Sequence, residues 1–289
     1  MNQRLALIVS IVFVLGSLSP ASAQLLVARD GPIVYGHHHL NVSNLAAHKK
    51  FFVETLGGTA VKVGANSAEI VKFPNVLIFF RQLAPSGGTK GTTVNHIGFS
   101  VPNLRHTVDK VKANGYRMIT RDEVAPNRAV KDDIAAPATP GGASIAFIMG
   151  PDDTKVELVE VNAQTSPIAL HHVHFFNPPN ADMRAWYVKV FGGKPGIGGG
   201  GTFLTATLPG VTLNFSPSME PVVGTQGRSI DHIGFEVKNL EVFCKRLERD
   251  GITLAVAYHK VAALDIAVAF ITDPWGTYIE LTEGLDKIS

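Results

Sequence analysis

The sequence predicts an α+β protein built from four similar units, and three observations support this. A short motif that begins with histidine recurs four times along the 289 residues. Each copy starts a segment of alternating apolar and polar residues, which is typical of a β-strand. Each segment is followed by a helical pattern that stops at glycine, a residue that suits the C-terminal cap of a helix.

The motif has the form H-x-x-[LF]-x-V-x-N-L in the copies that begin at His37, His96 and His232, and a degraded copy begins at His172. The first two copies start 59 residues apart, and those at His172 and His232 start 60 residues apart. Because internal repeats of fixed period reflect repeated structural units, we predict two domains of two units each.

The predicted domains comprise residues 33–161 and 170–284, joined by a polar linker at 162–169. Within a unit we expect one strand, one helix, and then two or three strands. The later strand candidates are Ser67–Phe73, Asn75–Gln82, Ser144–Met149, Lys155–Val161, Phe203–Leu208, Val211–Phe215, Ala267–Thr272 and Thr277–Thr282. The helices should stop at Gly57-Gly58, Gly115, Gly192-Gly193 and Gly251.

Composition excludes some classes of function. The chain has 26 basic and 24 acidic residues, with no basic run, so we expect no nucleic-acid partner. Apolar residues make up 45% of the chain, enough to bury a core. The single cysteine excludes an intramolecular disulfide and a thiolate metal cluster within one chain.

Residues 1–23 have the pattern of a cleavable signal peptide. Arg4 precedes the apolar run Leu5–Leu18, and Ala21-Ser22-Ala23 matches an A-x-A cleavage site. The run is short for a membrane span, although an uncleaved anchor helix is the alternative. We therefore expect a periplasmic or secreted protein with no stable membrane partner after cleavage.

Histidines gather on one face of the predicted first strands. Alternate residues of a strand share a face, so His37 and His39 point the same way, as do His172 and His174. His96 opens the equivalent strand of the second unit. A single strand histidine is more often a surface or core residue, but here the pattern repeats.

A glutamate lies inside an apolar strand near the end of each predicted domain. Val156 and Leu158 flank Glu157, and Glu280 has similar neighbours. A buried carboxylate is costly unless it meets a cation or strong donors. Two imidazoles and one carboxylate can bind a divalent metal and leave open coordination positions, as in non-haem iron oxygenases.

At this level the chain resembles the vicinal oxygen chelate superfamily, which includes glyoxalase I, bleomycin-resistance proteins and extradiol dioxygenases. The resemblance rests on His-Ile-Gly-Phe-x-Val at His96 and His232, and on Asp273-Pro274-Trp275-Gly276 followed by Glu280-Leu281. It implies four βαβββ units paired into two glyoxalase/dioxygenase-like domains, each forming a cup that holds a metal.

The resemblance also implies the ligand sets. It assigns His172, His232 and Glu280 to the second domain, expected to hold the main active site. It assigns His37, His96 and Glu157 to the first. His174 and His39 accompany these sets as candidate catalytic acid–base groups, with an extra metal ligand or a hydrogen bond to the glutamate as alternatives.

Two departures from the family pattern affect the expected reaction. Phe270 stands where extradiol dioxygenases are expected to have a tyrosine. Neither Val76–Phe80 nor Val211–Phe215 offers the second metal carboxylate common in glyoxalase I.

We therefore expect an exported, metal-dependent enzyme that acts on a small substrate with vicinal oxygens. Dioxygenase-like chemistry with Fe²⁺ is the first hypothesis, and Zn²⁺, Mn²⁺, Ni²⁺ or Co²⁺ are alternatives. A glyoxalase-like lyase or isomerase is the second hypothesis. A non-catalytic small-molecule-binding protein, like bleomycin-resistance proteins, is the third. The sequence leaves a homodimer open.

Overall fold

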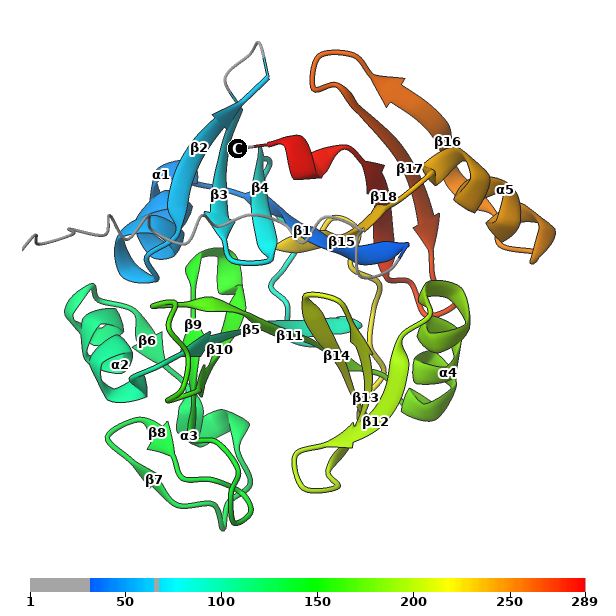
Figure 1. The fold of residues 1–289 in the computed structure, drawn as a ribbon. Coiled ribbons are helices and arrows are strands. Elements are labelled where there is room, and N and C mark those ends of the chain that lie inside the picture. The colour runs from blue at the N-terminus through cyan, green and yellow to red at the C-terminus, as the bar shows by residue number, and fades with distance from the viewer. Residues whose placement is uncertain (1–31, 65–67, 289) are drawn as a thin grey trace, which may run out of the picture.

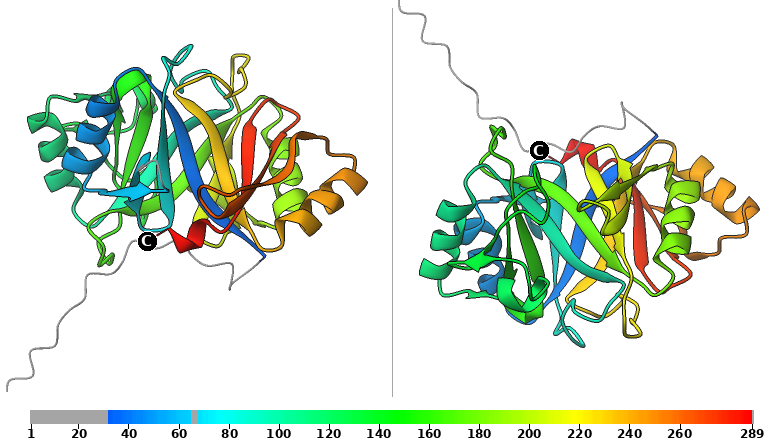
Figure 2. Two further views of the ribbon diagram at one scale, coloured as in Figure 1. Left: turned by 90° about the horizontal axis from the view of Figure 1, so that it is seen from above. Right: turned by 90° about the horizontal axis from the view of Figure 1, so that it is seen from below.

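The computed structural model describes residues 32–64 and 68–288, and the predicted signal peptide lies outside these ranges. The chain forms two curved sheets stacked back to back (Figure 1). Strands occupy the middle of the molecule and helices lie at its two ends, α1 and α2 at one and α4 and α5 at the other (Figure 2). This confirms the α+β class.

The first sheet has eight strands. Their spatial order is β16 (Leu254–Val261), β17 (Ile266–Thr272), β18 (Tyr278–Glu283), β15 (Ile230–Val237), β1 (Ile33–Val42), β4 (Val76–Gln82), β3 (Ala68–Phe73) and β2 (Thr59–Val63). It therefore joins the first unit of the chain to the fourth.

The second sheet joins the second unit to the third. Its spatial order is β12 (Lys194–Gly198), β13 (Phe203–Leu208), β14 (Val211–Ser216), β11 (Ala169–Phe176), β5 (Val94–Val101), β10 (Lys155–Glu160), β9 (Ile145–Met149), β8 (Ile134–Ala135) and β7 (Val130–Lys131), and β6 (Arg117–Met118) pairs with β9. The predicted strand candidates match strands of the two sheets, with small shifts at their ends. The candidates did not include β2, β12 and β16, nor the short strands β6, β7 and β8.

Helices cover the outer ends of the sheets. They are α1 (Leu45–Lys49) with its π-helical continuation η1 (Lys50–Thr55), α2 (Leu104–Ala113), α3 (Thr120–Glu123), α4 (Asn180–Phe191) and α5 (Leu240–Arg249), with 3-10 turns η2 (Pro151–Asp153) and η3 (Leu285–Lys287). No helix in the described part of the chain has the length and apolar character that a membrane span requires.

The Asn-Leu end of the repeat motif starts three helices, α1, α2 and α5. Asn44 and Asn103 cap α1 and α2, and each side chain accepts a hydrogen bond from a backbone N–H three residues later. Asn239 adopts a left-handed conformation, and in place of its side chain Glu283 accepts hydrogen bonds from the backbone N–H groups of Asn239 and Leu240. The expected glycine stops are confirmed, as Gly192 shows with its φ of 76° at the end of α4.

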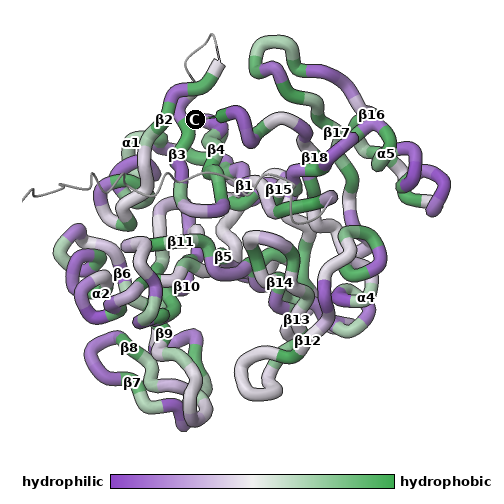
Figure 3. Tube along the Cα trace, viewed as in Figure 1, coloured by the Kyte–Doolittle hydropathy of each residue, from purple (hydrophilic) through white to green (hydrophobic). Residues whose placement is uncertain are grey.

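The main core lies between the convex faces of the two sheets and beneath the helices. Phe191 of α4 stacks on Phe235 at a centroid distance of 4.2 Å, and Phe73 packs on Phe99 at 4.7 Å across the sheets. Hydrophobic residues recur along the strands, whereas α2 and α5 are mostly hydrophilic (Figure 3). This core holds the two concave faces apart, and each concave face forms one cup.

The expectation that consecutive units share a cup is wrong. Two loops, 83–93 and 217–229, cross from one sheet to the other and run beside each other, joined by a bridge between Thr92 and Val223. The segment 161–168, in the predicted interdomain linker, instead connects β10 to β11 within one sheet. A connection of eight residues suits two strands separated only by β5, so the second and third units stay together.

Candidate metal centres

The first cup is formed by the eight-stranded sheet, and we call its metal-binding group centre A. It consists of His37 on β1, His232 on β15 and Glu280 on β18. The register places His37 and Glu280 on opposite sides of Gly234. A Cβ at Gly234 would lie 2.5 Å from Nε2 of His37 and closer still to other ring atoms. The glycine of the His-Ile-Gly-Phe motif therefore makes room for the imidazole of the other unit.

The donor atoms of centre A converge. Nε2 of His37 and Nε2 of His232 lie 2.9 and 3.0 Å from the same oxygen, Oε2 of Glu280. Burial opposes ionisation of Glu280, but the two imidazoles outweigh it and hold the pKa of the carboxyl far below its usual range. Burial likewise opposes protonation of His232, yet hydrogen bonds with Asp231 and Glu280 raise the pKa of His232.

The second cup is formed by the ten-stranded sheet, and its group is centre B. His96 on β5 and His172 on β11 direct Nε2 atoms at Oε2 of Glu157 on β10, at 2.9 and 3.1 Å. The two Nε2 atoms lie 3.3 Å apart. Gly98 separates His172 from Glu157 in the register, and a Cβ there would collide with the His172 ring. Centre B therefore repeats the construction of centre A.

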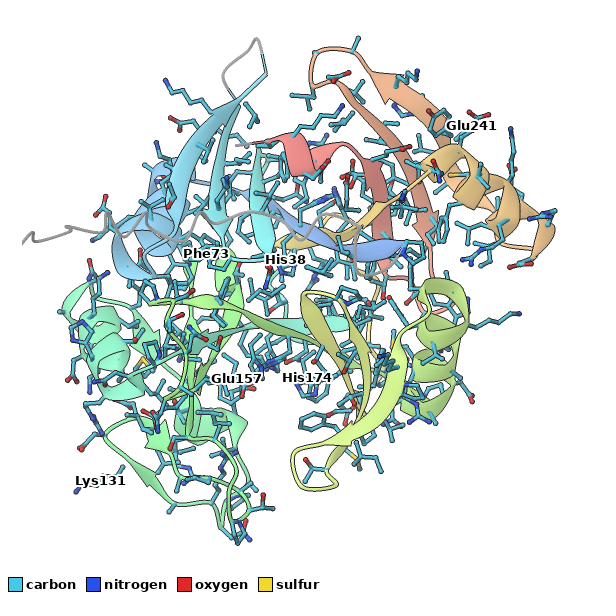
Figure 4. All side chains as sticks on the ribbon, in the orientation of Figure 1. His38, Phe73, Lys131, Glu157, His174 and Glu241 are labelled. Atoms are coloured by element: carbon cyan, nitrogen blue, oxygen red, sulfur yellow. The ribbon has the colours of Figure 1, made fainter. Side chains whose placement is uncertain are left out.

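Centre B has a fourth donor residue, which is its third imidazole. His174 offers a ring nitrogen within 4.8 Å of the other donors, and it lies beside Glu157 in Figure 4. Its Nε2 lies 2.8 Å from the hydroxyl oxygen of Ser216, and its buried Nδ1 has no hydrogen-bond partner among the described residues. Burial lowers the pKa of His174 well below its usual value, so the ring is neutral and Nδ1 is the nitrogen left for a ligand or a proton.

The equivalent residue of the first cup, His39, is placed differently. It lies outside the converging group and packs against the His232 ring at a centroid distance of 4.6 Å. Burial and the neighbouring imidazoles lower the pKa of His39 to about 3. The structure therefore brings both predicted acid–base histidines beside a centre, but only His174 joins the donor cluster.

The predicted division of the ligands between two sets is wrong. The sequence pattern assigned His172 to the set of His232 and Glu280, and His37 to the set of His96 and Glu157. The structure exchanges these two histidines: His37 joins centre A, and His172 joins centre B. The physical reason is the pairing of the first unit with the fourth, which brings β1 against β15 and β11 against β5.

The donor sets fit a divalent transition metal. Two imidazole nitrogens and one carboxylate oxygen suit Fe²⁺, Zn²⁺, Mn²⁺, Ni²⁺ or Co²⁺. Ligands that share one ion at about 2.1 Å lie about 3.0 Å apart when their bonds are perpendicular. The nitrogen-to-oxygen distances of 2.9 to 3.1 Å in both centres match this spacing. The orphaned Nδ1 of His174 adds a further donor at centre B.

Sequence reasoning missed the residues that orient the ligands. Asp231 holds Nδ1 of His232 at 2.7 Å, and Asn95 holds Nδ1 of His96 at 2.9 Å. In each case the acceptor directly precedes the histidine, so the signal was an Asp-His or Asn-His pair at the start of the motif. Such outer partners fix the tautomer and orientation of a metal-binding imidazole.

A cavity of about 420 Å³ opens onto centre A. His232 and Glu280 line it together with Tyr278 and Phe270, which stack on each other at 5.0 Å between ring centroids. Beyond the cavity, an apolar cluster that includes Leu77 fills the rest of the cup, and η3 packs into it. In Figure 1 this C-terminal segment lies between β4 and β18. Centre A therefore has an apolar floor and a solvent-facing cavity.

Comparisons with known proteins agree with this arrangement. The family model of the Glyoxalase/Bleomycin resistance protein/Dioxygenase superfamily matches the chain twice, at residues 34–147 and 138–281. No curated protein sequence matches significantly.

Solved structures share the fold at low sequence identity. Glyoxalase I from Zea mays has a TM-score of 0.64 and 14% identity, over 88% of this chain and 94% of that one. A mutant of the same enzyme gives 0.65 and 15%, over 89% and 95%. A candidate dioxygenase from Bacillus subtilis gives 0.60 and 11%, over 86% and 84%. With four βαβββ-type units, two cups and a family model that matches most of its length, the chain belongs to the glyoxalase/bleomycin resistance protein/dioxygenase superfamily.

Proposed function

We propose that this protein is a metal-dependent enzyme that acts on a small substrate with vicinal oxygen atoms. One observation carries the proposal: two largely buried groups of two histidines and a glutamate converge on the concave faces of two cups. Structural ion pairs do not require the same three residues twice. A glycine also clears space beside each pair of ligands, so both cups are built around their imidazoles.

A divalent cation held by such a group supplies a Lewis acid, to which two neighbouring substrate oxygens can bind. The remaining contributions come from the chain. Asp231 keeps His232 oriented, and the apolar floor of the first cup limits the access of water to bound substrate. Phe270 and Tyr278 provide a flat aromatic wall suited to a planar substrate.

Dioxygenase-type chemistry with Fe²⁺ is our first proposal for centre A. It offers three protein ligands, His37, His232 and Glu280. A set of two histidines and one carboxylate with open positions is typical of non-haem iron oxygenases. Tyr278 lines the cavity beside these ligands and provides a hydroxyl within the cup.

Isomerase or lyase chemistry is the second proposal, and centre B favours it. His174 is buried beside the donor group as a neutral imidazole with a free Nδ1. A neutral imidazole at such a position can take a proton from a substrate carbon or oxygen and return it elsewhere. If His174 binds the metal instead, it cannot serve as this base.

Metal content is the first measurement. The protein is purified anaerobically, and Fe, Zn, Mn, Ni and Co are quantified per chain in the wild type and in His37→Ala, His232→Ala and His172→Ala variants. We expect two ions per chain in the wild type. His37→Ala and His232→Ala should lose the same ion, and His172→Ala should lose the other. Absence of metal after loading with each cation would refute the proposal and leave a metal-free binding protein.

Turnover separates an enzyme from a binding protein. A binder saturates at a fixed stoichiometry and does not require His174. An enzyme consumes more substrate than there are sites, and His174→Gln should lower kcat if centre B performs proton transfer. Tight binding without turnover in metal-loaded protein would support the bleomycin-resistance-like alternative.

We also propose export to the periplasm or beyond the cell, on the basis of the signal-peptide pattern at residues 1–23. Mass spectrometry of the protein from a periplasmic fraction should show a chain that begins at Gln24. An intact N-terminus in a membrane fraction would instead indicate an anchor.

A further inference from the structure

The two cups have different charges at their rims. In register, Leu77 and Phe79 of β4 stand beside His37 and His39, and the next residue on that face is Arg81. Arg81 is exposed and lines the cavity that also contains His232 and Glu280. A cation therefore stands at the mouth of the first cup.

Arg81 is not neutralised by the protein. No carboxylate lies within 4.0 Å of its guanidinium among the described residues, and no hydrogen bond joins its side chain to them. The two carboxylates that line the same cavity are held elsewhere. Asp231 accepts from His232, and Glu280 accepts from both imidazoles of centre A. The guanidinium is thus free to bind an anion from solution.

The second cup serves as an internal comparison. Ser216 stands at the position equivalent to Arg81, and its hydroxyl contacts His174. Lys155 lies on the same strand face as the metal-binding glutamate of this cup, but Glu123 neutralises it at 2.7 Å. Arg128, in a nearby loop, donates Nε to the carbonyl oxygen of Ala136. Lys155 is therefore paired with a carboxylate, Arg128 is anchored at Nε by a carbonyl, and neither occupies the position equivalent to Arg81.

We propose that the first cup takes an anionic substrate, a small planar molecule with two vicinal oxygens at one end and a carboxylate at the other. The vicinal oxygens would face centre A, the body would lie against Phe270 and Tyr278, and the carboxylate would bind Arg81. This inference rests on the proposed function, because it assumes a metal at centre A. A guanidinium is suited to the carboxylate because its N–H groups match the two oxygens in a planar pair.

The test uses two probes that differ in one group. They are 3,4-dihydroxybenzoate and its neutral analogue 3,4-dihydroxybenzamide, which share a ring and two vicinal oxygens. Both are titrated anaerobically into Co²⁺-loaded protein, and the visible absorption of the bound Co²⁺ reports chelation. Titrations are made with the wild type and with His172→Ala, in which centre B has lost a ligand and the signal comes from the first cup.

We expect the acid to bind about tenfold more tightly than the amide, because a charge-assisted hydrogen bond at a solvent-facing site contributes this order of affinity. Arg81→Gln should remove the preference, and Arg81→Lys should restore part of it. Arg249→Gln is the matched control, since it removes the same charge from α5, outside the cavity lining. The preference of this control should equal that of the wild type.

The outcomes separate the two proposals. An equal acid-to-amide ratio in the wild type and Arg81→Gln, with clear chelation of Co²⁺ by both probes, would overturn the anionic substrate and leave the metal centre intact. Absence of Co²⁺ binding, or of any spectral response to either probe, would overturn the proposed function and this inference with it.

Discussion

Gly234 provides a sharp test of how the cups are assembled. Gly234→Ala adds a single carbon on a strand whose backbone conformation any residue can adopt, since no positive φ occurs there. The new Cβ would lie 2.5 Å from Nε2 of His37, whereas ordinary contacts begin at 3.4 Å. The imidazole must therefore move by roughly 0.9 Å or more, well beyond the tolerance of about 0.2 Å for a metal–ligand distance.

This displacement should remove one ligand from centre A and leave centre B unchanged. Loss of an outer-shell partner alone weakens metal binding by about 10- to 100-fold, so we expect at least about 100-fold weaker binding when a direct ligand moves. Overpacking of a buried strand also costs about 1–3 kcal/mol of the free energy of unfolding. Gly98→Ala should produce the mirror result, because the added carbon would collide with His172.

Metal content and thermal unfolding measure the two effects. Mass spectrometry of metals should find about one ion per chain in each variant and two in the wild type. The metal-free variants should unfold a few degrees below the metal-free wild type. Gly142→Ala is the control, since Gly142 is exposed and its Cβ would approach no atom closer than 3.1 Å. If Gly234→Ala kept both ions at unchanged affinity, the packing of His37 over Gly234 would be refuted.

Three further outcomes are expected. Asp231→Asn should weaken metal binding at centre A about tenfold in a metal titration, because an amide oxygen, such as that of the equivalent Asn95, accepts from an imidazole N–H more weakly than a carboxylate does. Equal affinity would show that Asp231 does not orient His232. When the free metal concentration is about 100 times the Kd of each ion, removal of the metal by a chelator should lower the unfolding temperature by about 5–10 °C. An unchanged temperature would contradict binding to the folded state. Burial lowers the pKa of His48 below 6.5. Hydrogen bonds from Ser43 and His48 outweigh burial at Asp152 and lower the pKa of this carboxyl below 3.8. Both groups therefore bind fewer protons in the folded state than in the unfolded state. The stability that His48 contributes is complete above pH 6.5 and is lost as the pH falls. In metal-free His48→Gln, the slope of the free energy of unfolding against pH should therefore decrease by up to about 1.4 kcal/mol per pH unit. An unchanged slope would show that His48 is not buried as a neutral ring.

Local information placed most elements, and the resemblance to a known superfamily named the six residues of the two His, His, Glu groups. Alternation placed His37 and His39 on one strand face before any neighbour was known. Arg81 and Tyr278, which line the cavity beside centre A, were not found in this way. They belong to different units, and their convergence depends on the curvature of a sheet that spans both.

The sequence by itself determined the four units, their strand and helix order, and the chemical type of the metal ligands. Only the tertiary structure decided which histidine serves which glutamate. The reason is that His96 and His232 carry the same His-Ile-Gly-Phe motif, and each glycine accepts an imidazole from a neighbouring first strand without specifying the unit that provides it. The choice is made by long-range packing, in which β1 meets β15 nearly two hundred residues away while a short connection keeps β11 beside β5.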